Sequence, residues 1–253
     1  MKIAVCIKQV VTREWQLRVN DQKTWIRDQD ASFELNEPDA YALEEALRLK
    51  EKHGGEVLVC SAGPARATQV IREALARGAD RAIHVEADSL ATADANAVAA
   101  ALAGALKEEA VDLVLTGLQS DDQGFGQVGV VLAEKLGMPH ATIIMEVQKT
   151  DAGLKVKREL EGGWFQWVAL PLPALLTIQS GINQLRYATL KGIMAAKKKE
   201  IKKVTPAAAA APAQRITSIY FPEKGKKTQM LPGAPADAAR ELVKRLREEA
   251  RAL

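Results

Sequence analysis

The chain has 253 residues, of which 47% are apolar, and this is enough for one large domain, or one domain with appendages, around a buried core. This composition excludes a disordered chain. Lys and Arg number 35 against 32 Asp and Glu, and a formal net charge of +3 is too small to imply a nucleic-acid partner.

The two cysteines, Cys6 and Cys60, lie in apolar strand-like runs. They argue against a disulfide scaffold and a cysteine-based zinc site, and they favour a reducing compartment. No apolar stretch approaches the roughly 20 residues of a membrane helix. The strand pattern KIAVCIKQV follows Met1 with no signal-peptide pattern before it. We therefore expect a cytoplasmic protein that is not inserted in a membrane.

Strand-like and helix-like segments alternate along the first 150 residues. β-branched runs predict strands at 3–7, 56–63, 81–87 and 111–117, and segments with helical spacing predict helices at 39–54, 67–78, 92–110 and 128–137. This alternation is typical of parallel strands joined by crossover helices. We therefore predict an α/β fold with a doubly wound, mostly parallel sheet.

The pattern changes after residue 140. Residues 141–179 alternate apolar and polar side chains around the turns DAG and EGG, which predicts antiparallel strands that extend the sheet. The segment TPAAAAAPAQ at 205–214 has the composition of an exposed linker, and an amphipathic helix over 237–253 ends the chain. We therefore divide the chain into a nucleotide-binding domain at 1–203 and a linker with a C-terminal arm at 204–253, which we expect to lie on another surface.

Signals for an enzyme are weak. His53, His84 and His140 have no Cys, Asp or Glu at the spacing of metal ligands. The chain has no G-x-S-x-G elbow and no Walker A loop, and we expect the site to lack a G-x-G-x-x-G turn as well. An ordinary dehydrogenase or NTPase is therefore disfavoured, and we expect no metal site.

Open parallel sheets bind ligands at the carboxyl ends of their strands. Three polar loops lie at this edge of the predicted sheet, after a strand or just before a helix. They are Asn36–Asp39, Ser61–Pro64 and Gly117–Gly129. The glycines of the third loop allow close approach to its backbone, and the amide N–H groups before the next helix can bind a phosphate. Each loop alone could be a plain connector, but their shared position at one edge favours a nucleotide site.

Taken in order, several segments resemble the beta (small) subunit of electron transfer flavoprotein. KIAVCIKQV resembles the first strand of that family, NEPDAYALEEALRLKE its first nucleotide loop and helix, and SAGPARATQVIREALARGADRAIHVE its second and third strands. The most specific segment is VKRELEGGWFQWVALPLPALLT, in which a basic residue and an acidic-Gly-Gly turn precede a Pro-apolar-Thr strand. LRYATLKGIMAAKKKEI is similar to its partner-recognition loop, which we expect at 185–199 within the domain at 1–203. The resemblance also implies that the C-terminal arm at 204–253 contacts the family's alpha subunit. The resemblance covers nearly the whole chain.

The resemblance implies an adenine nucleotide alpha hydrolase-like fold and an electron carrier without catalytic residues. The family's beta subunit pairs with an alpha subunit that carries most of an FAD. The heterodimer passes electrons from flavin dehydrogenases, such as the acyl-CoA dehydrogenases of fatty acid oxidation, to a membrane quinone oxidoreductase. The beta subunit also buries AMP as a structural element. The cofactor-binding positions implied here are Cys6, Asn36, Glu37, Pro38, Asp39, Ala62, Gly117, Gln119, Ser120, Asp121, Asp122, Gln123, Gly124, Phe125, Gly126, Gln127 and Val128.

Two departures from the family pattern concern the cofactors. Many members that bind AMP have several consecutive acidic residues in the last loop, whereas this loop ends in Gln127-Val128-Gly129. That ending is closer to members whose beta subunit holds a second FAD and bifurcates electrons, although we favour AMP. Near Arg13 some members place an aromatic residue beside the flavin, so that contact cannot be transferred.

The resemblance also implies residues that bind partners. Leu190 would be the anchor that enters a pocket of each dehydrogenase, with Arg186 and Tyr187 in the same loop, and Glu159 would pair with the alpha subunit. The alternative for Leu190 is the core of a helix that also contains Ile193 and Met194.

Two further groups of residues could contact partners. The lysines at 197–199, 202 and 203 could steer an acidic partner or form a solvated face. We expect Trp164, Phe165 and Trp167 to be partly exposed on a hairpin. Two other function classes remain open: a standalone adenylate-binding module, and an enzyme such as a transferase that acts on an adenylate.

Overall fold

The structure is a computed structural model that describes residues 1–206, 212–222, 225 and 228–253. These residues form two compact units, Met1–Ile219 and Tyr220–Leu253. The predicted linker begins within the first unit, and its residues 207–211 lie outside the described residues. The second unit contains the helix α6 (Pro235–Glu248), which begins and ends slightly before the predicted helix. No helix in the described ranges is long and apolar enough to cross a membrane.

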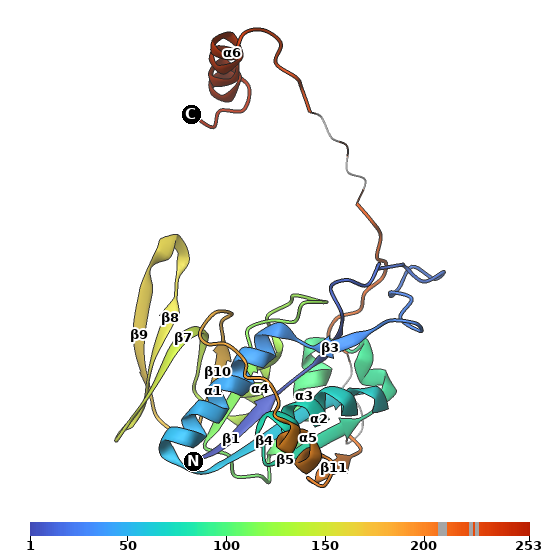
Figure 1. Ribbon diagram of the computed structural model, residues 1–253, viewed down its shortest axis with the longest axis vertical. Helices are drawn as coiled ribbons and strands as arrows, with labels where there is room; N and C mark the ends of the chain where they lie inside the picture. The colour runs from blue at the N-terminus through green and yellow to red at the C-terminus, as the bar shows by residue number, and fades with distance from the viewer. Residues whose placement is uncertain (207–211, 223–224, 226–227) are drawn as a thin grey trace. The chain divides into compact units, whose positions relative to one another are not determined.

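Among the described residues, nine strands form the main sheet in the order β11-β5-β4-β1-β6-β10-β7-β8-β9 (Figure 1). Their bounds are β1 Lys2–Cys6, β4 Glu56–Gly63, β5 Arg81–Glu86, β6 Leu113–Gly117, β7 His140–Thr150, β8 Gly153–Glu159, β9 Phe165–Leu170, β10 Ala174–Ile178 and β11 Ile201–Val204. A separate antiparallel pair joins β2 (Gln9–Val11) to β3 (Phe33–Leu35). The predicted α/β class with a mostly parallel sheet is confirmed.

Helices cover both faces of the sheet. One face packs against α1 (Glu37–His53), α2 (Thr68–Arg77) and α5 (Leu190–Ala196), and the other packs against α3 (Ala95–Leu106) and α4 (Val128–Leu136) (Figure 1). Short 3-10 turns lie at Ala65–Ala67, Asp88–Ala91 and Glu161–Gly163. The sheet is thus buried on both sides, which explains why its central strands are continuous apolar runs rather than alternating ones.

The antiparallel extension consists of β7, β8 and β9, which pair antiparallel to one another. The prediction is wrong for β10, because this strand leaves the extension and lies between β6 and β7, parallel to both. All five of its residues, ALLTI, are buried. An unbroken buried run fits a central parallel strand better than the outer strand of a hairpin, whose side chains alternate between core and solvent.

Helix α3 is shorter than the predicted helix at 92–110. The carboxylate of Asp94 caps its first turn, with Oδ1 accepting from the backbone N–H of Ala97 at 2.8 Å. The other oxygen, Oδ2, accepts from the backbone N–H groups of Ala213 and Gln214 at 2.5 and 2.7 Å, and so ties the start of the C-terminal stretch to this helix. At the other end, Ala110 has φ of 46°, which a continuing helix does not allow.

Two helical glycines in the first unit allow a test of how closely the helices pack on the sheet. A Cβ at Gly129 of α4 would lie 2.6 Å from Thr177 Cγ2 and 2.7 Å from Thr116 Oγ1, whereas a Cβ at Gly104 of α3 would have no atom within 4 Å. We expect Gly129→Ala to lower the free energy of unfolding by about 1–3 kcal/mol through overpacking. The matched change Gly104→Ala should raise it by about 0.5–1 kcal/mol through helix propensity. Urea denaturation measures both, and equal midpoints for the two variants would contradict the close approach of α4 to the sheet.

Candidate functional site

The site lies at the topological switch point of the sheet, where the order in which strands are added changes sides. From β1, the next strands β4 and β5 are added on one side, while β6 and β10 lie on the other. In open α/β sheets the crevice outside the carboxyl ends of such strands is the usual ligand site. The three loops that the sequence analysis selected follow β4 and β6 and begin α1, so the structure brings them to this one edge.

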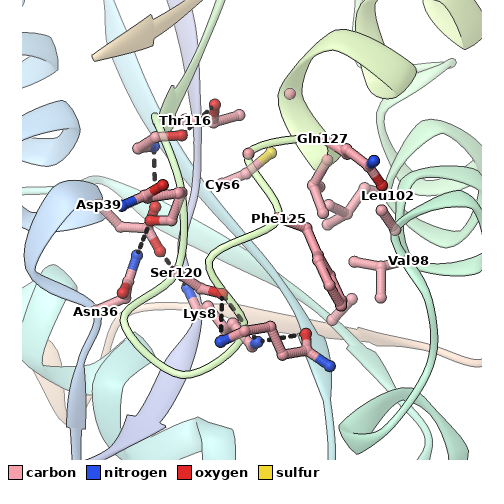
Figure 2. A pocket seen from close by; sticks show the side chains of 18 of the residues that line it. Cys6, Lys8, Asn36, Asp39, Val98, Leu102, Thr116, Ser120, Phe125 and Gln127 are labelled. Atoms are coloured by element: carbon pink, nitrogen blue, oxygen red, sulfur yellow. Dashed lines mark hydrogen bonds between the residues drawn. The ribbon is translucent and has the colours of Figure 1, made fainter. Parts of the chain in front are cut away.

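A cavity of about 100 Å³ lies at this edge (Figure 2). The residues at predicted cofactor positions that line it are Cys6, Asn36, Asp39, Ala62, Gly117, Gln119, Ser120, Gln123, Phe125, Gly126, Gln127 and Val128. Asp121 and Asp122 line an adjoining cleft instead. Within the described part of the chain, Glu37, Pro38 and Gly124 line neither space.

Asp39 is buried in the first turn of α1 and joins this turn to two strand ends. One carboxylate oxygen accepts from the backbone N–H of Lys8 at 2.8 Å, and the other accepts from the backbone N–H of Gly117 at 2.9 Å. Burial raises the pKa of Asp39 to about 7, although these two backbone donors act to lower it. The carboxyl group therefore titrates near neutral pH in the folded protein.

Asn36 is the N-cap residue of α1, but its side chain makes no capping bond. Instead, Asn36 Nδ2 donates to the carbonyl of Gln119 at 3.0 Å, and Asn36 Oδ1 accepts from the backbone N–H of Asp121 at 2.9 Å. Both bonds are to the loop that follows β6. The start of α1 therefore holds this loop in place from a distance of more than 80 residues along the chain.

Two cations from the start of the chain neutralise the acidic residues of the same loop. Lys8 Nζ lies 2.7 Å from Asp122 Oδ1 and donates to Gln123 Oε1 at 3.0 Å. Arg13 pairs with Asp121 at 3.4 Å and also contacts the carboxylate of Glu37. The loop therefore keeps two carboxylates next to the cavity without presenting two unpaired negative charges to it.

The expectation that the site lacks a G-x-G-x-x-G turn is wrong. Residues 124–129 read GFGQVG, in the loop that joins β6 to α4 and runs into the first turn of α4. Gly124 and Gly126 have φ of 65° and 63°, and Gly129 lies against the sheet with no room for a Cβ. In dinucleotide-binding turns these three glycines allow the tight turn, the approach of the phosphate and close helix packing. The first N–H groups of α4 have no acceptor within the helix, as a phosphate site requires.

The opposite wall of the cavity is apolar and was not predicted. It is formed by Leu90, Val98 and Leu102, of which the last two belong to α3, and Phe125 extends toward them from the loop (Figure 2). The sequence shows α3 only as an Ala-rich helix, so nothing in its local pattern separates these wall residues from ordinary core.

Cys6 also lines the cavity. The neighbouring Cys60 thiol and burial raise the pKa of Cys6, which keeps this thiol protonated.

A larger cleft of about 470 Å³ adjoins the cavity and shares Lys8 and Phe125 with it. Its lining includes three aromatic side chains and two arginines, namely Trp15, Trp25, Phe33, Arg13 and Arg66. The guanidinium of Arg66 lies over the ring of Phe33 at 4.0 Å from its centroid. Flat rings and cations are the groups that hold planar, negatively charged ligands.

The predicted partner-binding residues lie away from the cavity. Leu190 and Tyr187 are 78% and 90% exposed, so the alternative that Leu190 is helix core is wrong. Arg186 is held by Glu44 and Glu51 of α1, while Glu159 Oε2 accepts from Gln179 Nε2 at 3.0 Å.

The two further groups that could contact partners, the hairpin aromatics and the lysines, both include exposed residues. Trp164, Phe165 and Trp167 of the β8–β9 hairpin are partly exposed, as expected. The predicted lysine cluster divides into two groups. Lys199 donates to the carbonyls of Leu75 in α2 and Ala79 just after it, and Lys203 pairs with Glu86 at 2.6 Å. Lys197, Lys198 and Lys202 are exposed.

Comparisons with known proteins agree on one family. The family model for the electron transfer flavoprotein domain matches residues 24–209. The chain is 37% identical to the electron transfer flavoprotein subunit beta of Methylophilus methylotrophus over 98% of both chains. It is 35% identical to the subunit of the same name from Bacillus subtilis over the whole of both chains, and 36% identical to the human one over 98% of this chain and 97% of the relative.

The buried carboxyl group of Asp39 predicts a specific dependence of stability on pH. Its pKa is about 7 in the folded protein, against an ordinary value of 3.8. The folded state thus binds the proton more tightly, so this group's contribution is fully present below about pH 4 and is lost as the pH rises through 7. The free energy of unfolding of the parent minus that of Asp39→Asn should fall by about 3 kcal/mol between pH 4.5 and 8.

Urea denaturation of both proteins at the two pH values measures this difference. The matched control is Asp151→Asn, which makes the same change at an exposed position in the turn between β7 and β8. A pH-independent difference for Asp39→Asn would show that its carboxyl group is already ionised at pH 4.5.

Proposed function

The chain belongs to the electron transfer flavoprotein family, and we propose that it is the beta subunit of a heterodimeric electron carrier that binds AMP and completes the FAD site of an alpha subunit. The heterodimer would accept electrons from flavin dehydrogenases, such as acyl-CoA dehydrogenases, and pass them to a membrane quinone oxidoreductase. The observation that carries this proposal is the cavity at the β1–β6 switch point, in a chain similar over its full length to beta subunits.

The chemistry of the cavity supports an adenine nucleotide. The glycine turn at 124–129 and the N-terminus of α4 supply backbone N–H groups suited to a phosphate. The apolar wall at Val98 and Leu102, together with Phe125, suits a planar base. Because Lys8 and Arg13 pair with the two loop carboxylates, the added charge of a phosphate is tolerated there. These residues can hold AMP, which supplies no redox chemistry.

The adjoining cleft supports a second proposal about the flavin. Trp15, Trp25 and Phe33 line it together with Arg13 and Arg66, a combination suited to a planar, negatively charged ligand. We propose that this cleft faces the FAD of the alpha subunit. When bound, the flavin supplies the one-electron and two-electron chemistry, and the beta subunit shapes its surroundings. The proposed carrier needs no bond-making catalytic residue of its own, unlike the adenylate transferase considered above.

Leu190 supports the proposed docking of dehydrogenases. It begins α5 and is exposed together with Ile193 and Met194, which makes a small apolar surface on the first unit. Exposed Lys197 and Lys198 follow it and can raise the rate of encounter with an acidic partner. One buried leucine suits a reversible encounter, because a single side chain contributes only about 1.5–3 kcal/mol.

The identity of the nucleotide can be measured directly. We expect acid release from the co-purified heterodimer, followed by mass spectrometry, to give about one AMP and one FAD per heterodimer. Phe125→Ala should reduce the AMP retained after dialysis, because the base loses an aromatic contact, while Trp164→Ala on the exposed hairpin should retain it. Two FAD and no AMP would instead support the bifurcating beta subunit. A folded monomer with no adenylate and no affinity for an alpha subunit would contradict the whole proposal.

The docking proposal predicts the effect of Leu190→Ala. Because loss of one buried leucine removes about 1.5–3 kcal/mol, the KM of an acyl-CoA dehydrogenase for the heterodimer should rise roughly ten- to hundredfold. The AMP content and the thermal stability of the heterodimer should stay unchanged, since Leu190 is exposed. The measurement is the rate of flavin reduction at a series of heterodimer concentrations. Unchanged KM would remove Leu190 from the docking surface.

A further inference from the structure

We propose that Arg186 is a positioning residue that fixes the docking segment, residues 183–196, on α1 before any partner binds, and that its guanidinium does not contact the partner. This inference rests on the proposed function, in which Leu190 of the same segment docks dehydrogenases. It replaces the expectation that Arg186 itself binds the partner with a role inside the subunit.

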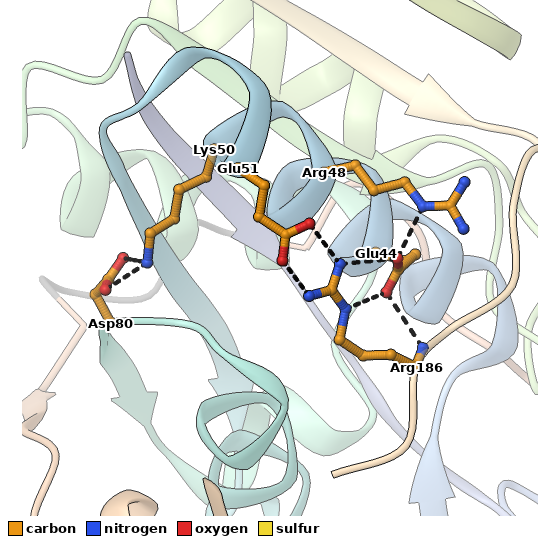
Figure 3. Close-up of polar contacts among 6 residues, drawn as sticks. All are labelled: Glu44, Arg48, Lys50, Glu51, Asp80 and Arg186. Carbon is orange, nitrogen blue, oxygen red and sulfur yellow. Dashed lines mark hydrogen bonds and ion pairs between the residues drawn. The ribbon is translucent and has the colours of Figure 1, made fainter. Parts of the chain in front are cut away.

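Arg186 makes a two-sided clamp with two carboxylates of α1 (Figure 3). Its Nε and its backbone N–H donate to Glu44 Oε2 at 2.9 and 3.2 Å, and Nη2 donates to Glu44 Oε1 at 3.0 Å. On the outer side, Nη2 donates to Glu51 Oε2 at 3.1 Å and Nη1 contacts Glu51 Oε1. All three guanidinium nitrogens are therefore engaged within the subunit.

The inner carboxylate, that of Glu44, is buried and depends on this ion pair. The side chain of Glu44 is only 4% exposed, and it also accepts from Nε of Arg48, one turn along α1, at 2.8 Å. Burial acts to raise the pKa of Glu44, but the hydrogen bonds from Arg186 and Arg48 outweigh it, and the net shift is downward. A buried carboxylate that loses its main partner is strongly destabilised, so the clamp holds the loop tightly.

The rest of the docking segment is fixed as well. Before Arg186, the Asn183 Nδ2 donates to the carbonyl of Tyr41 at 3.2 Å and to Glu45 Oε2 at 3.1 Å, both on α1. Within α5, Gly192 lies so close to the carbonyl of Ala76 that a Cβ would overlap it.

The segment is held at its far end by α2. Nη1 of Arg72, in this helix, donates to the carbonyls of Ala196 and Lys199 at 2.6 and 2.8 Å. Both ends of the segment are therefore held, by α1 at one end and by α2 at the other.

This arrangement leaves Tyr187, Leu190 and Met194 exposed on a fixed backbone. A loop that is already in its bound conformation does not lose conformational entropy on docking, and this saving improves affinity without any new contact. Most of the hydrogen-bonding capacity of the Arg186 guanidinium is used inside the subunit, and moving it onto a partner would leave the buried carboxylate of Glu44 without its main partner. The geometry thus favours positioning over direct contact.

The test uses the intact heterodimer and an acyl-CoA dehydrogenase that reduces the parent. Arg186→Lys keeps the charge, but one ammonium group cannot span both carboxylates. We expect the KM for the heterodimer to rise about three- to tenfold while kcat at saturation stays within about twofold, because the loop must be ordered on binding. The AMP content should not change. If Arg186→Lys does not fold, Glu51→Gln removes only the outer half of the clamp and should act in the same direction.

Two comparisons separate this inference from a general structural effect. Arg48→Gln is the matched control, since Arg48 binds the same Glu44 from within α1 and does not touch the docking segment; its KM should equal that of the parent. In a Leu190→Ala background, Arg186→Lys should raise the KM less than twofold further, because its effect passes through the leucine.

The outcomes are distinct. If Leu190→Ala raises the KM while Arg186→Lys and Glu51→Gln do not, the inference is overturned and the docking proposal stands. If Arg186→Lys raises the KM equally with and without Leu190, the arginine contacts the partner directly and the inference is again overturned. If Leu190→Ala has no effect on the KM, the docking proposal fails and the inference fails with it.

Discussion

The end of the sheet that carries the candidate site depends on a single buried carboxylate. Asp39 accepts the backbone N–H groups of Lys8 and Gly117, which lie at the ends of the two central strands β1 and β6. A Cβ at Gly117 would lie only 2.5 Å from Asp39 Oδ1, so glycine is required for α1 to approach this closely. With α1 fixed there, Asn36 at its N-cap position can bind the loop after β6. The cavity follows from this sequence of contacts.

Much of the fold could be predicted because its signals are local. Alternating β-branched and helical runs gave the parallel core, and glycines marked helix ends such as Gly78 and Gly137. The order of strands was less accessible. Residues 174–178 follow a hairpin in sequence but pair with β6, and only their unbroken apolar character distinguishes them from the antiparallel strands before them. Such an insertion depends on tertiary packing, which local patterns do not encode.

The candidate site, like the fold, could be predicted only in part. Loops at strand ends can be predicted from their position, and the glycine spacing at 124–129 is itself a signal in the sequence. The partners of individual charges could not be predicted. Lys8 and Asp122 are 114 residues apart, and Arg186 and Glu44 are 142 apart. A lone arginine in a polar loop is equally compatible with binding a partner or its own helix, and only the burial of Glu44 distinguishes the two.

The contacts that hold the cavity loop and those that hold the docking segment both come from α1 and its N-cap. Asn36 and Asp39 at its start hold the loop of the candidate cavity, and Glu44, Glu45 and Glu51 further along hold the docking segment. A helix of 17 residues is held rigid by its internal hydrogen bonds, so fixing one end also fixes where the other end lies. A nucleotide bound at the first turn would therefore stabilise the element that also carries the docking segment. Under the proposed function, AMP would then have a structural role in the subunit that is separate from redox chemistry.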